Sequence, residues 1–221
     1  MRTVAPALGS GAYDLLSAAH LLGIDERTLR RWGQKNAAGY TPLLEPTHGW
    51  AYSFHDLLSL AVIAVMKQRG VTPTGVRSTI KFLQDRYQVP RPLAHADVVA
   101  TLATSGNSVL LVAEGTDASR SGQGVLLATV ERYLQPIEYG SDRLASLWRP
   151  ADRVVLDPTV QVGHPCVEGT RITTETLIGR FTQAESAEAI SSDLRISVED
   201  VMAAVDFERR LVTTGGLAHV G

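Results

Sequence analysis

The 221-residue sequence is poor in cysteine and in long apolar runs, and each shortage excludes a class of protein. The single cysteine, Cys166, excludes a framework of internal disulfides and is typical of a reducing compartment. The longest nearly apolar run, residues 57–66, is shorter than the ~20 residues that a membrane-spanning helix needs. No basic and then apolar leader opens the chain. The sequence therefore predicts a globular cytoplasmic protein without membrane contact.

The net charge of −2 conceals an uneven distribution of charge. Residues 1–90 hold ten Lys or Arg and six Asp or Glu, whereas residues 91–221 hold 11 and 17. Because phosphate attracts cations, we expect only the N-terminal part to contact nucleic acid. A random scatter of charges is the alternative explanation of the same numbers.

Two short helices joined by a glycine turn are predicted near the N-terminus. Apolar residues recur at helical spacing over 13–22, Gly23 interrupts them, and Asp25 suits the N-cap of a helix over 26–34. A helix pair joined by such a turn is typical of a helix-turn-helix. The second helix is expected to bury Leu29 and Trp32. The predicted DNA-contacting residues on and beside its other face are Arg27, Thr28, Arg30, Arg31, Gln34 and Lys35.

Arginine and glutamine on this face suit DNA, because guanidinium groups grip phosphate or guanine and glutamine pairs with adenine. An ordinary solvated basic face is the alternative. Residues 43–44 and 50–52 are expected to pair as a two-stranded wing, which adds Trp50 and Tyr52 to the predicted DNA contacts. Helices over 56–68 and from Pro73 to residue 87 follow, the latter with Thr72 as its cap.

This order of elements resembles the N-terminal winged helix of MerR-type regulators, over roughly residues 13–87. Residues 28–32 (Thr-Leu-Arg-Arg-Trp) look like the recognition-helix core of that family, and residues 49–53 look like the end of its wing. One departure is Ala51, where the family's wing usually carries an arginine; His48 and Trp50 are its nearest substitutes. The resemblance implies a dimer that reads a two-fold DNA site.

Pro90 and Pro92 mark a domain boundary, and residues 91–150 match no family that we identify. We expect this segment to link two domains and to mediate dimerisation. Its predicted elements, in order, are a helix over 95–103, a buried strand over 109–113, an element over 125–134 that suits helix or strand with helix favoured, and a helical turn over 143–148.

A strand over 154–156 precedes a motif of the form Gly-x-Pro-x-x-x-Gly-Thr-Arg. Its two glycines permit a positive φ, its proline stiffens the loop, and Arg171 is expected to bond loop carbonyls or Asp157. The residues assigned to this structural loop are Asp157, Gly163, Pro165, Gly169, Thr170 and Arg171.

Three helices are predicted after the loop, over 174–181, over 186–194 and from Ser197, which forms a capping box with Asp200. Their acidic residues favour a protein partner over DNA. The fold class is mainly α with small β elements (α+β), with an N-terminal winged helix-turn-helix and a C-terminal three-helix domain preceded by a short strand. The predicted divisions are a flexible segment 1–12, a winged domain 13–90, a linking region 91–150, a helical domain 151–211 and a mobile tail 212–221.

Residues 153–211 resemble the C-terminal domain of VapB-type antitoxins, a domain of unknown function, although Val162 and Cys166 depart from its pattern. The resemblance implies the antitoxin of a type II toxin–antitoxin module, which binds a PIN-like ribonuclease toxin and represses its own promoter. Arg209 and Arg210 are our candidates for entering the toxin's cluster of carboxylates. The alternative is that both are ordinary cations favoured by a helix C-terminus.

Two other functions are weighed against this one. A stand-alone MerR-like regulator would need a small-molecule pocket in its C-terminal half. A metal or other cofactor is not expected, because no pair of the six histidines has ligand spacing. His164 and Cys166 lie in one loop, whereas catalytic Cys–His pairs usually come from separate elements, so we expect no enzyme and a cysteine buried in the core.

Overall fold

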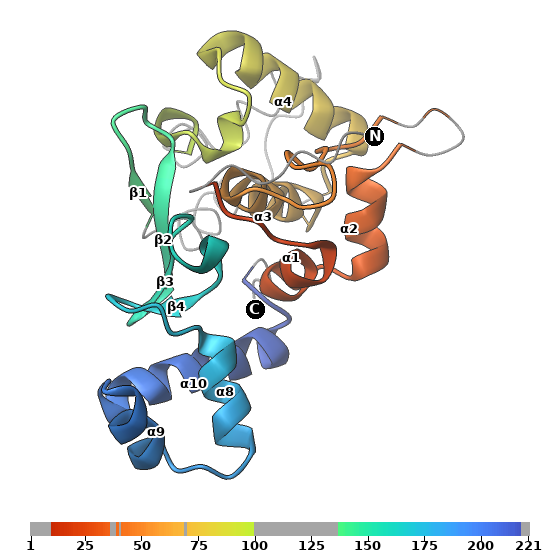
Figure 1. The fold of residues 1–221 in the computed structure, drawn as a ribbon. Helices are drawn as coiled ribbons and strands as arrows, with labels where there is room; N and C mark the ends of the chain where they lie inside the picture. Colours follow the sequence, from red (N-terminus) through yellow and green to blue (C-terminus); the bar gives the residue numbers. More distant parts are fainter. Residues whose placement is uncertain (1–9, 36–38, 40, 69, 100–136, 218–221) are drawn as a thin grey trace, which may run out of the picture.

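The computed structural model describes residues 10–35, 39, 41–68, 70–99 and 137–217 (Figure 1). It has the expected α+β class, with helices before and after a small antiparallel sheet. The helices before the sheet are α1 (Leu15–Leu22), α2 (Glu26–Gly33), α3 (Phe54–Gln68) and α4 (Pro73–Tyr87). Those after it are α8 (Thr174–Thr182), α9 (Ala187–Leu194) and α10 (Val198–Thr214). Within the described ranges, none of the helices is long and apolar enough to cross a membrane.

Polar caps start the helices where the sequence predicts them. Asp25 accepts the N–H of Thr28 at 2.9 Å, and Thr72 accepts the N–H of Gly75 at 3.1 Å. The capping box of Ser197 with Asp200 is also present. Each cap satisfies backbone N–H groups that have no partner inside their own helix. The predicted starts of α2, α4 and α10 are therefore confirmed.

The sheet formed by the described residues has the strand order β1-β2-β3-β4. Its strands are β1 (Ile137–Tyr139), β2 (Ala145–Ala151), β3 (Val154–Leu156) and β4 (Cys166–Val167). The predicted helical turn over 143–148 is wrong, because Trp148 pairs with Ile137 on one side and Leu156 on the other. Its indole is buried in the core, and such packing overrides local propensity. The short strand predicted before the C-terminal helices is β3, inside a larger sheet.

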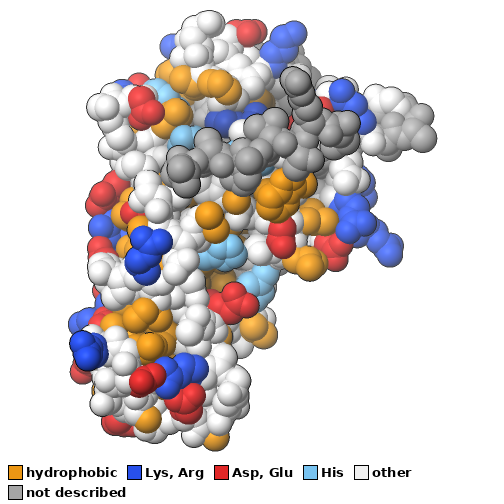
Figure 2. Space-filling model, viewed as in Figure 1, with side chains coloured by type: hydrophobic (Ala, Val, Ile, Leu, Met, Phe, Trp, Pro, Cys, Tyr) orange, Lys and Arg blue, Asp and Glu red, His pale blue; other side chains and the backbone are white. Residues whose placement is uncertain are grey.

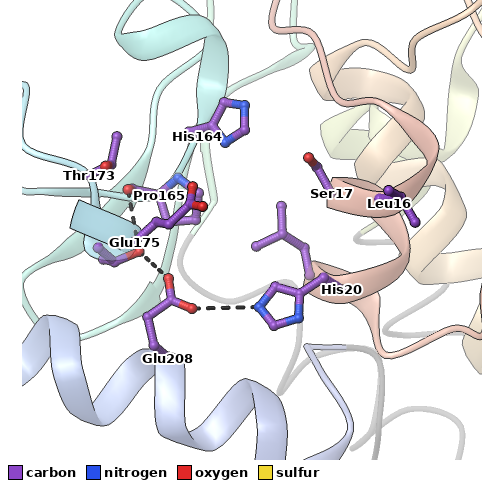
Figure 3. A pocket seen from close by; sticks show the side chains of 10 residues that line it. Leu16, Ser17, His20, His164, Pro165, Thr173, Glu175 and Glu208 are labelled. Atoms are coloured by element: carbon purple, nitrogen blue, oxygen red, sulfur yellow. Dashed lines mark hydrogen bonds and ion pairs between the residues drawn. The ribbon is translucent and has the colours of Figure 1, made fainter. Parts of the chain in front are cut away.

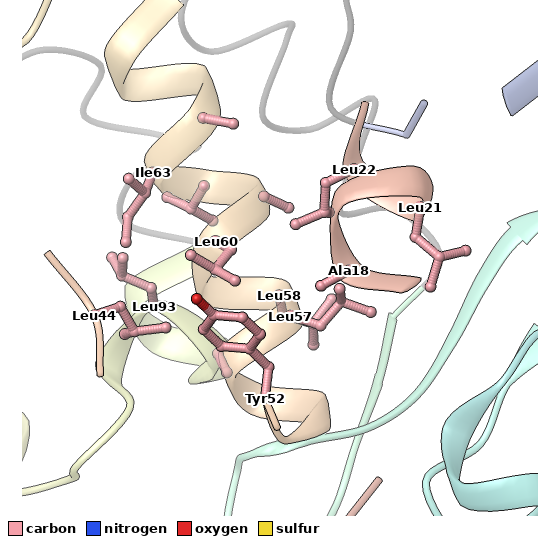
Figure 4. Close-up of a cluster of buried hydrophobic side chains, with 14 of the residues drawn as sticks. Ala18, Leu21, Leu22, Leu44, Tyr52, Leu57, Leu58, Leu60, Ile63 and Leu93 are labelled. Atoms are coloured by element: carbon pink, nitrogen blue, oxygen red, sulfur yellow. The ribbon is translucent and has the colours of Figure 1, made fainter. Parts of the chain in front are cut away.

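The main core surrounds α3, whose apolar side chains face α1, the chain around Leu44 and Tyr52, and the 3₁₀ helix η1 (Pro92–Ala94) (Figure 4). The same cluster takes in Trp148 and Leu156 from the sheet and, from α10, Phe207 and Leu211. A second cluster joins α8, α9 and the earlier part of α10. The expected boundary between residues 150 and 151 thus falls inside β2, and α10 contributes to both cores.

Near both ends of the chain, the described residues form backbone hydrogen bonds to the folded part, and the predicted flexibility of segments 1–12 and 212–221 stays a prediction. Residues 10–12 bond to the folded chain, since the N–H of Phe54 donates to the Ser10 carbonyl at 2.9 Å. At the C-terminal end, α10 continues to Thr214, and residues 215–217 pack on α1 and the turn after it. The helix expected over 95–103 is helical over 96–99. Its remainder and the elements predicted over 109–113 and 125–134 lie outside the described residues.

Candidate nucleic-acid interface and its junction with the C-terminal domain

Helix α2 displays a basic face and is anchored through its apolar side. Leu29 and Trp32 are buried, as the sequence predicts. Figure 2 shows basic side chains gathered over α2, at the right of the view. The exposed members of the predicted set on and next to this helix are Arg27, Arg30, Arg31, Gln34 and Lys35, and Thr28 is half-buried. Exposed cations along one helix are what contact with phosphate requires, and their contact with DNA stays a prediction.

Neighbouring groups partly occupy this basic face. Arg30 forms an i,i+4 ion pair with Glu26, and the Lys35 Nζ lies 3.7 Å from a carboxylate oxygen of Glu45. Arg27 forms no ion pair with any residue that the structure describes. Exposed pairs contribute about 0.2–1 kcal/mol, so phosphate groups can displace them at small cost. Arg27 is the cation most available to a ligand.

A buried carboxylate, Asp56, fixes the wing (residues 45–53) to the start of α3. Its Oδ2 accepts the N–H groups of Thr47 at 2.8 Å and Ser53 at 2.9 Å. The guanidinium of Arg91 pairs with its other oxygen. The Asp56 side chain is 0% exposed, so this cation is its one compensating charge among the described residues. Sequence reasoning missed the pair, because 35 residues separate its members.

The wing differs from the predicted two-stranded hairpin. The N–H groups of Leu43 and Leu44 both donate to the Trp32 carbonyl, at 2.8 and 3.3 Å, while Tyr52 pairs with Tyr13. Loop 43–44 therefore packs on the end of α2, where its leucines are buried in the core.

Two of the aromatic wing residues have different surroundings. Trp50 is 53% exposed and remains a predicted DNA contact. Tyr52 is 2% exposed, and burial raises the pKa of its hydroxyl to about 12, so its assignment to the DNA contacts is corrected to a core role. His48 is buried with its ring nitrogen 3.2 Å from the Gly11 carbonyl, and Ala51 is buried as well. Of the two substitutes considered for the arginine missing at residue 51, buried His48 cannot reach a phosphate, and only exposed Trp50 remains.

Tyr13 joins the N-terminal and C-terminal parts of the chain. Its buried hydroxyl donates to the Gly163 carbonyl at 2.6 Å, and its backbone bonds twice to Tyr52. A Cβ at Gly163 would lie 2.3 Å from the Tyr13 oxygen, so the predicted loop glycine is required for close approach as well as for its φ of +90°. Val162 beside it has φ 49°, rare for a β-branched residue, and its carbonyl accepts the N–H of Ala12 at 2.8 Å.

The Gly-Thr-Arg turn is closed by the Thr170 hydroxyl, which donates to the Val167 carbonyl at 2.9 Å and accepts the N–H of Ile172 at 3.0 Å. Gly169 has φ +74° in this turn, as the motif predicts. The carbonyl of buried Pro165 accepts the N–H of Thr174 at 2.9 Å and so positions the start of α8. The loop therefore connects the sheet to the C-terminal helices.

The sequence predicts that Arg171 bonds loop carbonyls or Asp157, but among the described residues its side chain forms neither bond. Asp157 accepts the N–H and the hydroxyl of Thr159, at 2.8 and 2.6 Å, and the Arg171 side chain is exposed.

Cys166 is buried, as predicted, and burial raises the pKa of its thiol to about 11. A buried thiol with a raised pKa is a poor nucleophile. In the described ranges no three His, Cys, Asp or Glu side chains are arranged to hold a metal ion.

The end of α10 packs on the turn of the helix-turn-helix. The N–H of Leu217 donates to the Leu21 carbonyl at 2.7 Å. Gly23 has φ +66°, and a Cβ built on it would lie 1.0 Å from the Gly215 carbonyl oxygen. A Cβ on Gly216 would likewise lie 2.0 Å from the Gly23 nitrogen. Gly23 therefore also allows residues 215–217 to pack closely against the turn, a contact that the sequence alone did not indicate.

Arg209 and Arg210 lie on the exposed side of α10. The Arg209 guanidinium lies over the ring of Phe181, 5.2 Å from its centre, a cation–π contact. Both arginines line a shallow hollow together with Asp206 and Asp152. Contact with a partner through these two residues stays a prediction.

Comparison with known families assigns both halves of this architecture. The family described as "MerR HTH family regulatory protein" matches residues 13–83, and the family described as "Protein of unknown function (DUF433)" matches residues 154–207. The chain thus contains a MerR-type helix-turn-helix domain followed by a DUF433 domain, as the sequence motifs predict.

A curated protein and a solved structure resemble the chain over most of its length. The protein named "Putative antitoxin VapB45" from Mycobacterium tuberculosis is 27% identical over 88% of this chain and 92% of its own. The crystal structure of Rv2018 from Mycobacterium tuberculosis, 25% identical, superimposes with a TM-score of 0.62 over 93% of this chain and 100% of that one. These similarities are those of an antitoxin or a DNA-binding regulator.

Proposed function

We propose that the protein is the antitoxin of a type II toxin–antitoxin module, acts in the cytoplasm without catalysis, and represses its own promoter. The observation that carries the proposal is the similarity to an antitoxin-named protein across both domains, from the helix-turn-helix to α10. The DUF433 part binds a PIN-like ribonuclease toxin, and the MerR-type part binds the operator as a homodimer.

In the proposed operator complex, α2 lies in the major groove. Its buried Leu29 and Trp32 hold it on the core. Arg27 and Arg31 then contact phosphate or guanine, and Gln34 contacts adenine. Trp50 on the wing packs against the adjacent sugar–phosphate backbone. Two protomers related by a two-fold axis would read a two-fold operator.

Replacing Arg27 tests this interface most cleanly, because this side chain has no ion pair to lose within the described structure. Arg27→Ala is expected to weaken binding to the DNA upstream of its own gene about tenfold, or ~1.4 kcal/mol, and to reduce the salt dependence by about one phosphate contact. Fluorescence anisotropy at several salt concentrations measures both quantities. Arg86→Ala removes an exposed arginine from α4 and serves as the control. Equal affinities for the two variants would exclude Arg27 from the DNA contact.

In the proposed toxin complex, Arg209 and Arg210 project from α10 toward the acidic active site of the ribonuclease. Guanidinium groups pair with carboxylates bidentately, which suits this task. Arg209→Ala/Arg210→Ala is expected to weaken the toxin complex at least tenfold and to restore ribonuclease activity in the mixture. Glu199→Gln, at the exposed start of α10, is the control. Full neutralisation by the double variant would reject these two residues while leaving the antitoxin assignment to be judged on complex formation itself.

A further inference from the structure

A cleft of about 270 Å³ separates helix α1 from the C-terminal domain (Figure 3). One wall is α1, with Leu16, Ser17 and His20, and the opposite wall carries His164 and Pro165 from the loop of the DUF433 domain. Helices α8 and α10 complete the lining. The volume lies just below the roughly 300–1,000 Å³ of ordinary small-molecule sites, so its occupant has few heavy atoms.

Apart from the imidazoles of His20 and His164, the charged groups of this cleft are of one sign. Glu175 from α8 and Glu208 from α10 line it, and no lysine or arginine is among its described lining residues. The Glu208 side chain is 13% exposed. Its carboxylate accepts the hydroxyl of Thr174, and its other oxygen lies 3.5 Å from the ring nitrogen of His20. A partly buried carboxylate held by a hydroxyl and an imidazole still lacks a permanent cation.

The remaining wall is apolar. Leu16, Leu21 and Pro165 line the same space as the two carboxylates. An alkyl stem can therefore lie along these side chains while its charged end reaches Glu208. The described residues offer no arrangement of ligands for a metal ion, and the absence of lysine and arginine from the described wall disfavours an anion.

We propose that this cleft binds a small organic cation, an ammonium or guanidinium group on a short alkyl stem, with Glu208 as its counter-ion. The bound group contacts α1 of the helix-turn-helix and α10 of the DUF433 domain together, and so stabilises the docked arrangement of both domains. A cationic group of this class is carried by a free alkylamine or alkylguanidine and also by an arginine side chain of a protein partner.

The test is a calorimetric titration of the full-length chain with agmatine, with the blocked tripeptide acetyl-Gly-Arg-Gly-amide, and with 1-butanol as the neutral comparator. We expect saturable binding of a guanidinium probe and none of butanol. Saturation by agmatine points to a free cation, whereas saturation by the tripeptide alone points to a partner's arginine. Failure of both guanidinium probes to saturate would overturn the proposal.

Glu208→Gln keeps an oxygen for the Thr174 hydroxyl and removes only the charge, so binding of the probe is expected to weaken at least tenfold. Glu199→Gln removes one exposed charge from the same helix outside the cleft and is the matched control. Glu175→Gln, at an exposed position, provides a second cleft variant should Glu208→Gln unfold. Equal affinity in the cleft variants and the control would contradict the assigned counter-ion.

Discussion

Arg91→Ala is expected to lower the free energy of unfolding by about 3–5 kcal/mol, because it leaves the fully buried Asp56 carboxylate without its cation. Arg91 also donates to the Glu45 carbonyl at 2.8 Å, so the wing loses a direct bond as well. Denaturant unfolding followed by circular dichroism measures the loss. Because the wing carries Trp50, DNA affinity is expected to fall in the same variant.

Two further variants distinguish the cost of the unpaired buried charge from a nonspecific loss of stability. Adding Asp56→Asn to Arg91→Ala is expected to recover part of the lost stability, because the amide removes the buried charge and its oxygen still accepts the N–H groups of Thr47 and Ser53. Arg86→Ala, at an exposed position, is expected to stay within about 0.5 kcal/mol of the parent. An Arg91→Ala chain as stable as the Arg86→Ala chain would contradict the role given to the ion pair.

Gly23→Ala is expected to cost about 2–5 kcal/mol, since it adds left-handed backbone strain to a steric collision with the Gly215 carbonyl. Because the colliding atom belongs to the backbone of Gly215, the collision is relieved only if residues 215–217 move away from α1. Equilibrium unfolding reports the cost. Exchange of the Leu217 amide, which bonds to Leu21, reports the release.

Gly70 offers a matched control for this substitution. It has φ +82°, but a Cβ there would meet nothing within 4 Å, so Gly70→Ala measures the strain alone. A chain ending at Thr214 removes the colliding segment, and in that background Gly23→Ala is expected to cost no more than Gly70→Ala. If the cost of Gly23→Ala were unchanged in the shortened chain, the close packing of Gly23 on Gly215 would not be its cause.

Local signals predicted much of the fold. Caps at Asp25, Thr72 and Ser197 fix helix starts within a few residues, and apolar spacing identified Leu29 and Trp32 as the buried side of α2. Both family resemblances were visible in short motifs. These features depend on neighbours close in sequence, which is why the residues themselves indicate them.

The misassigned features depend on distant partners. Trp148 lies in a strand because β1 and β3 pair with β2, and Tyr52 is buried because Tyr13 pairs with its backbone. Two further contacts join residues that are far apart in the chain. Gly215 packs on Gly23, and Asp56 forms an ion pair with Arg91. No local pattern encodes such contacts, so the cleft beside Glu208 was not predicted either.

The most direct test of the antitoxin proposal is co-expression of the tagged chain with the product of its neighbouring gene, followed by anisotropy on their shared promoter. We expect a stable complex that has no ribonuclease activity. Its affinity for the promoter is expected to fall steeply as the salt concentration rises. Promoter binding by the chain alone, with no complex and no inhibition of the neighbour's product, would contradict the account and assign the protein to stand-alone MerR-like regulators.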